Sequence, residues 1–179
     1  ASWFGYSSAI GRTKNPYAPE RDPGGSSAGT GAGVAANLGV VGIGEDTGGS
    51  IRVPAGYCNL FGIRVTTGLI SRTGLSPLVS RQDTAGPMAR TVEDMARVLD
   101  VIRGYDADDE WTGTTAAVSS EPFTEALDPD ALAGARVGVL RQAFGDADDP
   151  EATPVTSVTE DALSMLSDAG ATLVDPVSI

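Results

Sequence analysis

Two groups of glycine and serine residues within the first fifty positions could carry out nucleophilic chemistry. They are Gly24-Gly25-Ser26-Ser27 and Asp46-Thr47-Gly48-Gly49-Ser50. A serine hydroxyl becomes a nucleophile when a base takes its proton. Two glycines in a loop can adopt positive φ and point successive N–H groups at a carbonyl oxygen that becomes negative in the transition state. The pattern predicts acyl transfer, with Ser50 as nucleophile and a hydroxyl of the first group as proton relay.

The base that takes this proton cannot be a histidine of this chain, because the sequence contains none. Gly25-Ser26-Ser27-Ala28-Gly29 fits the GxSxG pattern of esterases and would make Ser27 the nucleophile, but that mechanism needs a histidine. The histidine would have to come from outside these residues. A lysine that is kept neutral by burial can activate a serine instead. The composition therefore favours a Ser–Ser–Lys site over an esterase site.

A cofactor site is the third interpretation of the glycine-rich region. Gly31-Ala32-Gly33-Val34-Ala35-Ala36 fits the GxGxxA pattern of dinucleotide-binding proteins. That pattern binds a pyrophosphate only when a strand leads into it, and here the preceding residues are the first glycine–serine group. Close packing of a helix explains the small residues better. The single cysteine excludes an internal disulfide and a CxxC metal pair, and we expect neither a metal ion nor a cofactor.

The charged residues are divided unevenly along the 179-residue chain. There are 12 Lys and Arg residues against 24 Asp and Glu residues, which gives a formal net charge of −12. Residues 1–100 hold nine basic and eight acidic residues, a balance of +1, whereas residues 101–179 hold three and sixteen, a balance of −13. Such a surface repels phosphate backbones, so we expect no direct binding of nucleic acid. No apolar run approaches the roughly 18 residues of a membrane helix, and we expect no membrane contact.

Hydrophobic periodicity predicts the elements that must position the two groups. A tight loop is expected at 45–50, and an acidic surface excursion at 105–131. Thr91 and Thr153 are the expected N-caps of the last two helices. Val155, Val158, Ala162, Met165 and Leu166 should form a buried stripe. The predicted strands are 40–43, 61–65, 136–140 and 172–174, and the predicted helices are 28–37, 92–102 and 154–169. This alternation indicates an α/β layer fold with a largely parallel sheet.

The spacing and context of the two serines resemble those of the amidase signature family of serine hydrolases. Ser26 and Ser50 are 24 residues apart, as the two catalytic serines of that family are. The second group continues as Ile51-Arg52-Val53-Pro54-Ala55, which also matches. Further matching segments are Asn15-Pro16, Phe61–Arg64, Gly68–Arg72 and Asp83–Thr91. The resemblance is strong over residues 3–104 and weaker after Leu132.

The resemblance implies a role for each serine. Ser50 would form the acyl-enzyme, and Ser26, which follows a cis peptide bond in this family, would relay the proton. The catalytic lysine of the family lies well upstream of the relay serine, so we expect it outside this chain. The one lysine present, Lys14, lies only twelve residues before Ser26 in a different context, and we expect it to be a surface charge.

The resemblance also implies supporting groups around the nucleophile. Asp46 and Arg52 would hold the loop, and Ser27 would be a hydrogen-bond neighbour. One departure concerns Glu45, since the family usually has Thr or Ser there, and the sequence leaves the direction of this side chain open. The oxyanion hole would be formed by the backbone N–H groups of Thr47, Gly48, Gly49 and Ser50.

For the whole molecule, the resemblance implies a three-layer α/β/α fold with a central mixed β-sheet. We expect residues 1–179 to be the central part of one such domain, truncated at both ends and inactive alone. The enzyme would hydrolyse a small-molecule amide in the cytoplasm, and a homodimer is one open assembly state. The alternatives are a glutamine-hydrolysing amidotransferase subunit of the tRNA-dependent pathway and a non-catalytic scaffold that retains the fold.

Overall fold

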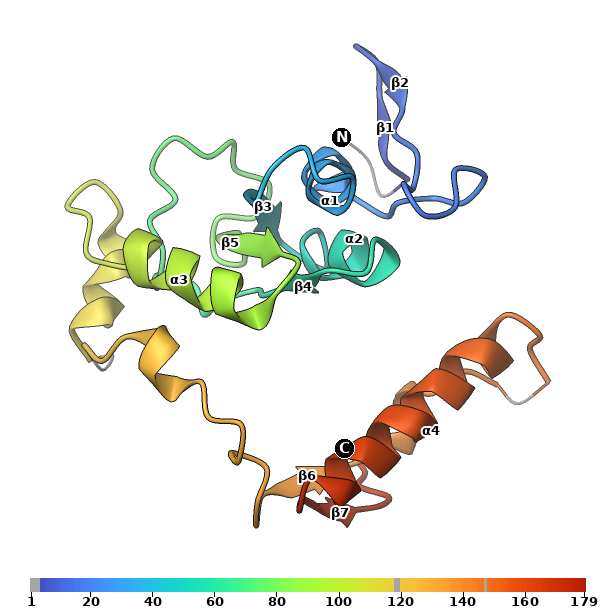
Figure 1. The fold of residues 1–179 in the computed structure, drawn as a ribbon. Coiled ribbons are helices and arrows are strands. Elements are labelled where there is room, and N and C mark those ends of the chain that lie inside the picture. The colour runs from blue at the N-terminus through green and yellow to red at the C-terminus, as the bar shows by residue number, and fades with distance from the viewer. Residues whose placement is uncertain (1–3, 118–119, 147) are drawn as a thin grey trace. The chain divides into compact units, whose positions relative to one another are not determined.

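The computed structural model describes residues 4–117, 120–146 and 148–179, which belong to two compact units, Ala1–Ala126 and Leu127–Ile179 (Figure 1). Both units combine helices with short strands, as expected for an α/β protein. Among the described residues, no helix is both long and apolar enough to span a membrane.

The first unit contains a three-stranded sheet in the order β3-β5-β4 and a separate two-stranded hairpin. In the sheet, β3 (Val41–Asp46) runs antiparallel to the whole of β5 (Thr84–Ala89), and β4 (Phe61–Gly62) pairs antiparallel with its end. The prediction of a largely parallel sheet is therefore wrong for this unit, because periodicity indicates that a strand is buried but not which way its neighbour runs. The hairpin joins β1 (Tyr6–Ser7) and β2 (Gly11–Arg12).

Helices pack against both faces of this sheet. The helices of the unit are α1 (Ala28–Ala35), α2 (Arg52–Tyr57) and α3 (Val92–Ile102). Successive side chains of a strand point to opposite faces, and β5 places Met88 against Ala55 of α2 and Ala85 against Leu99 of α3. Gly62 permits the close approach of α2, because a Cβ at this position would lie 2.6 Å from the Cβ of Ala55.

The third helix begins as the sequence predicts. Thr91 is its N-cap, and the Thr91 hydroxyl accepts a hydrogen bond from the N–H of Asp94 at 3.0 Å, which satisfies one of the unpaired donors of the first turn. The same hydroxyl donates to the Asp94 carboxylate at 2.8 Å. The preceding residue, Arg90, donates to the carbonyl oxygens of Val34 (2.7 Å) and Gly39 (2.9 Å) and so ties the C-terminal end of α1 to β5.

The acidic stretch after α3 contains two short 3₁₀ helices, η1 (Glu110–Ala117) and η2 (Phe123–Ala126). Most of its described residues are exposed, but Asp109 and Thr112 are buried, at 7% and 0% exposure. The negative charge of Asp109 therefore lies inside the unit, where it needs a positively charged partner or hydrogen-bond donors.

The second unit pairs β6 (Arg136–Gly138) with β7 (Thr172–Val174) in parallel, with η3 (Arg141–Ala143) and α4 (Ala152–Asp168) between them. The N-cap of α4 is Glu151, two residues before the predicted Thr153, because the chain already turns at Asp149, whose carbonyl oxygen accepts from Thr153 N–H. The predicted burial of the α4 stripe is wrong in the described structure, where Val155, Val158 and Met165 are 66–71% exposed. Within this unit, α4 contacts β7 but none of its residues is buried.

Four differences from the prediction concern elements near the serine-rich segments. The strand β3 continues through Glu45 and Asp46, which we expected in a loop, and β4 ends at Gly62 instead of Val65. Neither β5 nor α2 was expected. Gly86 and Pro87 interrupt the apolar pattern of β5, although both are buried. Only six residues form α2, too few for helical periodicity to be recognised.

Candidate active site

Residues Gly24–Ser27, which we call the serine turn, lead directly into α1. The Gly25–Ser26 peptide bond is cis, as the resemblance implies. Gly24 has φ of +74°, and a Cβ there would lie 2.9 Å from Val53 Cγ1 and 3.1 Å from Pro54 N. Glycine is therefore required for both the conformation and the close contact with the first turn of α2.

The serine turn meets the segment that carries Ser50. The N–H of Ser27 donates to the carbonyl oxygen of Ser50 at 3.1 Å, so the segments of both proposed catalytic serines are in direct contact. The Ser27 hydroxyl donates to Glu45 O and accepts from Glu45 N, both at 3.2 Å. This hydroxyl satisfies backbone groups on the edge of β3 and is therefore a structural group. That arrangement argues against the esterase interpretation, in which Ser27 would be the nucleophile.

Asp46 organises Thr47–Ser50, which we call the nucleophile loop. Its side chain is 0% exposed and accepts hydrogen bonds from the N–H groups of Gly49 (2.6 Å) and Ile51 (3.0 Å). Arg52 donates to the same carboxylate through Nε at 3.1 Å and Nη2 at 3.2 Å, and Arg64 Nε lies 3.6 Å from it. These contacts fit the expected roles of Asp46 and Arg52, and they add Arg64, for which the sequence suggested no role.

The pKa of Asp46 reflects this environment. Burial alone would raise the pKa, because it disfavours the charged form. The hydrogen bonds from the Arg52 side chain and from the N–H groups of Gly49, Ile51 and Arg52 outweigh burial and lower the pKa to about 2. Asp46 is therefore ionised at neutral pH and holds the loop as an anion.

The backbone N–H groups of the nucleophile loop divide into two kinds. The N–H of Gly49 donates to Asp46, so it is engaged in holding the loop. Among the described residues, the N–H groups of Thr47, Gly48 and Ser50 have no hydrogen-bond partner. Gly49 has φ of +138°, in the region that favours glycine. Three unengaged N–H groups in one turn are suited to a substrate oxygen that becomes negative.

The two proposed catalytic serines differ in exposure. Ser50 is 8% exposed, and Ser26 is half-buried. Within the described part of the chain, no hydrogen bond uses either hydroxyl, so the relay contact between them is not formed in this structure. Catalytic hydrogen bonds are commonly long without substrate and tighten when it binds. Lys14 is exposed, as expected for a surface charge.

Sequence reasoning missed Asp83, which contacts the nucleophile loop. The Thr47 hydroxyl donates to Asp83 Oδ1 at 2.5 Å. The signal was present, since Asp83 begins one of the matching segments, but no chemistry was attached to it. Glu45, whose direction the sequence left open, lines a cavity of about 210 Å³ together with Asp83 and has a buried Oε1 without a hydrogen-bond partner in the described structure. Burial and then the charge of Asp83 raise the pKa of Glu45.

The part of the chain that the structure describes contains no group of three His, Cys, Asp or Glu side chains that could hold a metal ion. The chemistry that this arrangement offers is a serine hydroxyl on a loop that a buried carboxylate fixes and that has unengaged N–H groups, in contact with the segment that carries a second serine.

Comparisons with known proteins identify the family. The Amidase family profile matches residues 2–179. A glutamyl-tRNA(Gln) amidotransferase subunit of Thermosynechococcus vestitus is 45% identical over 168 residues, which cover 94% of this chain and 33% of that protein. The native peptide amidase of Stenotrophomonas maltophilia has a TM-score of 0.86 at 40% identity, over 99% of this chain and 35% of that one.

A second solved structure leads to the same family. The corresponding glutamyl-tRNA(Gln) amidotransferase subunit of Thermotoga maritima has a TM-score of 0.81 at 34% identity, over 93% of this chain and 35% of that chain. The present chain thus spans about a third of the length of these relatives. The match over nearly all of its own residues, together with the serine turn and the nucleophile loop, shows that the chain belongs to the Amidase family.

Proposed function

We propose that the full-length enzyme, meaning the protein with the segments that the relatives have beyond this match, hydrolyses the C–N bond of a carboxylic amide through an acyl-enzyme on Ser50. A lysine outside this chain takes the proton of the Ser26 hydroxyl, and Ser26 takes the proton of Ser50. The Ser50 oxygen then attacks the amide carbonyl and forms a tetrahedral intermediate.

The negative oxygen of that intermediate is stabilised by backbone donors of the nucleophile loop. The N–H groups of Thr47, Gly48 and Ser50 are the ones not already engaged, whereas Gly49, which we expected to contribute, donates to Asp46 instead. Removing one such donor in a comparable site costs about 3–4 kcal/mol of barrier, so these donors would supply a large part of the rate enhancement.

The intermediate collapses when the C–N bond breaks. The proton held by the relay passes to the nitrogen, which leaves as ammonia or an amine. A water molecule then attacks the acyl-enzyme, gives its proton to the relay and releases the carboxylic acid, and Ser50 recovers its proton. No oxidant, reductant or cofactor is needed for this balance.

The observation that carries the proposal is the contact between the two serine-bearing segments. The Ser27 N–H to Ser50 C=O hydrogen bond of 3.1 Å joins the serine turn to the nucleophile loop, although Ser26 and Ser50 are 24 positions apart in the sequence. The second support is Asp46, which fixes the backbone just before and just after the nucleophile.

The test is the Ser50→Ala variant of the full-length enzyme. We expect amide hydrolysis to fall by about 10³-fold or more, because no other group can form the acyl-enzyme. Ser164→Ala is the matched control, since Ser164 is an exposed residue of α4 whose hydroxyl donates only to Glu160 O of its own helix. Turnover by Ser50→Ala comparable to that of the control would end the assignment. Residues 1–179 alone should not turn over an amide.

A second candidate function is glutamine hydrolysis as one subunit of a tRNA-dependent amidotransferase. The relative that is 45% identical carries that name, which favours this candidate. The balance of −13 over residues 101–179 disfavours direct contact with RNA, which a partner subunit would then have to provide. Release of ammonia from glutamine that rises when a partner is added would distinguish the two. A full-length sequence without the upstream lysine would favour a non-catalytic scaffold.

The remaining features of the proposal concern the whole molecule. The full-length fold would be a three-layer α/β/α domain with a mixed sheet, which is supported by helices on both faces of β5. Its substrate would be a small-molecule amide, in the cytoplasm. Mass measurement in solution would test a homodimer.

A further inference from the structure

Asp83 is a buried carboxylate that contacts the nucleophile loop at Thr47, from a distant part of the sequence. It is 3% exposed and precedes β5. Its carboxylate accepts from the Thr47 hydroxyl at 2.5 Å and from the N–H groups of Leu78 and Val79, both at 2.8 Å. Burial raises the pKa of Asp83, but these hydrogen bonds lower it further than burial raises it. Asp83 is therefore an anion that can only accept, and the Thr47 hydroxyl must be the donor.

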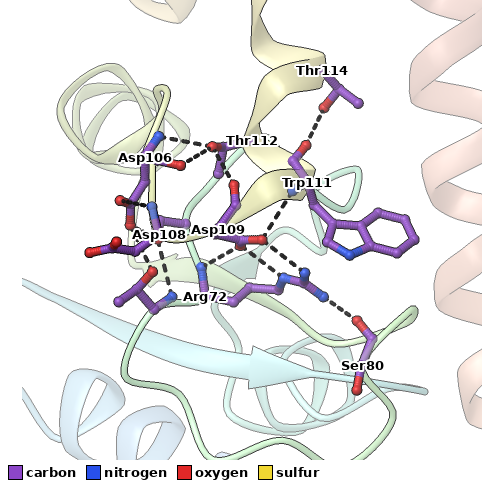
Figure 2. Close-up of polar contacts among 10 residues, drawn as sticks. Arg72, Ser80, Asp106, Asp108, Asp109, Trp111, Thr112 and Thr114 are labelled. Atoms are coloured by element: carbon purple, nitrogen blue, oxygen red, sulfur yellow. Dashed lines mark hydrogen bonds and ion pairs between the residues drawn. The ribbon is translucent and has the colours of Figure 1, made fainter.

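The two N–H groups that donate to Asp83 belong to a segment that Arg72 holds in place. Arg72 donates to Asp109 through its backbone N–H at 2.9 Å, Nε at 3.1 Å and Nη2 at 3.0 Å, and Nη1 donates to the carbonyl oxygen of Ser80 (Figure 2). The Arg72 guanidinium also lies 5.3 Å from the centre of the Trp111 ring. Arg72 thus joins both ends of residues 72–80, the segment that carries the N–H groups of residues 78 and 79.

Asp46 and Asp83 each hold one end of the nucleophile loop. Asp46 holds the end near Ser50 through the N–H groups of Gly49 and Ile51. Among the described residues, the one side-chain hydrogen bond that holds Thr47 is the bond to Asp83. Without it, rotation at Thr47 would redirect the N–H groups of Thr47 and Gly48, which have no other partner in the described structure.

We infer that Asp83 is a positioning residue for the reaction: through the Thr47 hydroxyl it fixes the first half of the nucleophile loop, so that the N–H groups of Thr47 and Gly48 point at the substrate oxygen. This inference rests on the proposed function. Asp83 itself does not touch the reacting atoms. Because the oxyanion exists only in the transition state and the intermediate, the loss of this anchor lowers kcat and leaves KM nearly unchanged.

The experiment compares Thr47→Val with Thr47→Ser in the full-length enzyme. Valine has a similar shape but no hydroxyl, whereas serine keeps the hydroxyl. We expect Thr47→Val to lower kcat by roughly 10- to 100-fold, the effect of a misplacement of about 1 Å, with KM within about 3-fold. Thr47→Ser should restore kcat to within about 3-fold of the original. The control is Thr124→Val, which also removes a Thr–Asp hydrogen bond, to Asp100 at 2.9 Å, and should keep the original rate.

A second variant covers the case in which Thr47→Val fails to fold, which a thermal melt would show. Asp83→Asn keeps the size of the side chain and removes its charge. It should also lower kcat without raising KM, and the double variant with Thr47→Val, where it folds, should lose no more than the more affected single variant, because both changes break one contact.

The outcomes separate this inference from the proposed function. Turnover by Ser50→Ala would overturn both. An inactive Ser50→Ala together with normal kcat in Thr47→Val, or in Asp83→Asn where Thr47→Val does not fold, would overturn only the positioning role. An effect on KM alone, an equal loss in Thr124→Val, or no recovery in Thr47→Ser would also overturn it, since each indicates a general loss of structure.

Discussion

Replacing Asp46 by Asn tests how the nucleophile loop is held. The wild-type carboxylate is fully buried and offers acceptors to the Gly49 and Ile51 N–H groups and to the Arg52 side chain. Asparagine keeps the shape but replaces one acceptor oxygen by an NH₂ group, which would face donors. Arg52 and Arg64 would also lose the negative charge that they share. We expect the loop to lose its geometry and the protein to lose stability.

The magnitude follows from the pKa of this carboxyl group. Its folded-state pKa of about 2, against the ordinary value of 3.8, corresponds to about 2 kcal/mol of stability at neutral pH. Because the folded pKa is the lower one, this stabilisation is present above pH 3.8 and is lost as the pH falls through 2. About 1 kcal/mol of it should have gone at pH 3.

Urea unfolding of the full-length enzyme at pH 7, 5 and 3 measures this effect. The difference in the free energy of unfolding between wild type and Asp46→Asn should be about 2 kcal/mol or more at pH 7, and about 1 kcal/mol smaller at pH 3. Amide hydrolysis should fall by roughly 100-fold or more, because the backbone on both sides of the nucleophile loses its anchor.

The control is Asp100→Asn. Asp100 also accepts backbone N–H groups, from Phe123 at 2.5 Å and Thr124 at 3.2 Å, but it lies on α3 and makes no contact with the nucleophile loop. This variant should keep the original rate of hydrolysis. A stability difference for Asp46→Asn that is equal at pH 7 and pH 3, or a rate within about 10-fold of wild type, would refute the reasoning.

Three further predictions concern stability, each measured by thermal melting of the full-length enzyme. Burial raises the pKa of Glu45 above its ordinary value of 4.5, so the ionised side chain destabilises the fold once the pH rises above 4.5. Glu45→Gln should therefore raise Tm at pH 7 but not at pH 4. Equal shifts of Tm at both pH values would contradict this. Thr91→Ala removes the hydroxyl that accepts the Asp94 N–H and should cost about 1 kcal/mol, whereas Thr91→Ser should not. At Gly68, with φ of +93°, a Cβ would lie 2.2 Å from the Trp111 carbonyl oxygen; Gly68→Ala should lower Tm strongly, and an unchanged Tm would show that the contact is not as close.

The sequence allowed a prediction for part of the site because its residues fall in two short and chemically distinctive segments. The pairing of Ser26 with Ser50 and the supporting role of Asp46 came from the resemblance to the amidase signature family, whose two catalytic serines have the same spacing. The start of α3 was equally local, since Thr91 and Asp94 are three residues apart and form the cap together. For Asp46 and for the Thr91 cap, the interaction that decides the local structure lies within one short segment.

The rest depends on contacts between distant segments. Asp83 reaches Thr47 across 36 residues, and Arg72 reaches Asp109 across 37, so neither pair leaves a periodic signal. The direction of strand pairing in the first unit also depends on contacts between segments that are far apart in the sequence. On α4 the periodic signal was present but not sufficient. It identified an apolar face but could not say what would cover that face.

The two hydroxyls that cover the free edge of β3 have a consequence for self-association. An unpaired strand edge can recruit a strand from another molecule and begin aggregation. Here Ser27 occupies both backbone groups of Glu45, and Thr30 donates to Ile43 O at 3.0 Å, so the start of α1 closes the edge against an incoming chain. A variant without these two hydroxyls would expose unpaired backbone groups of β3, the strand that leads to Ser50. Aggregation through this edge would then lower solubility together with activity.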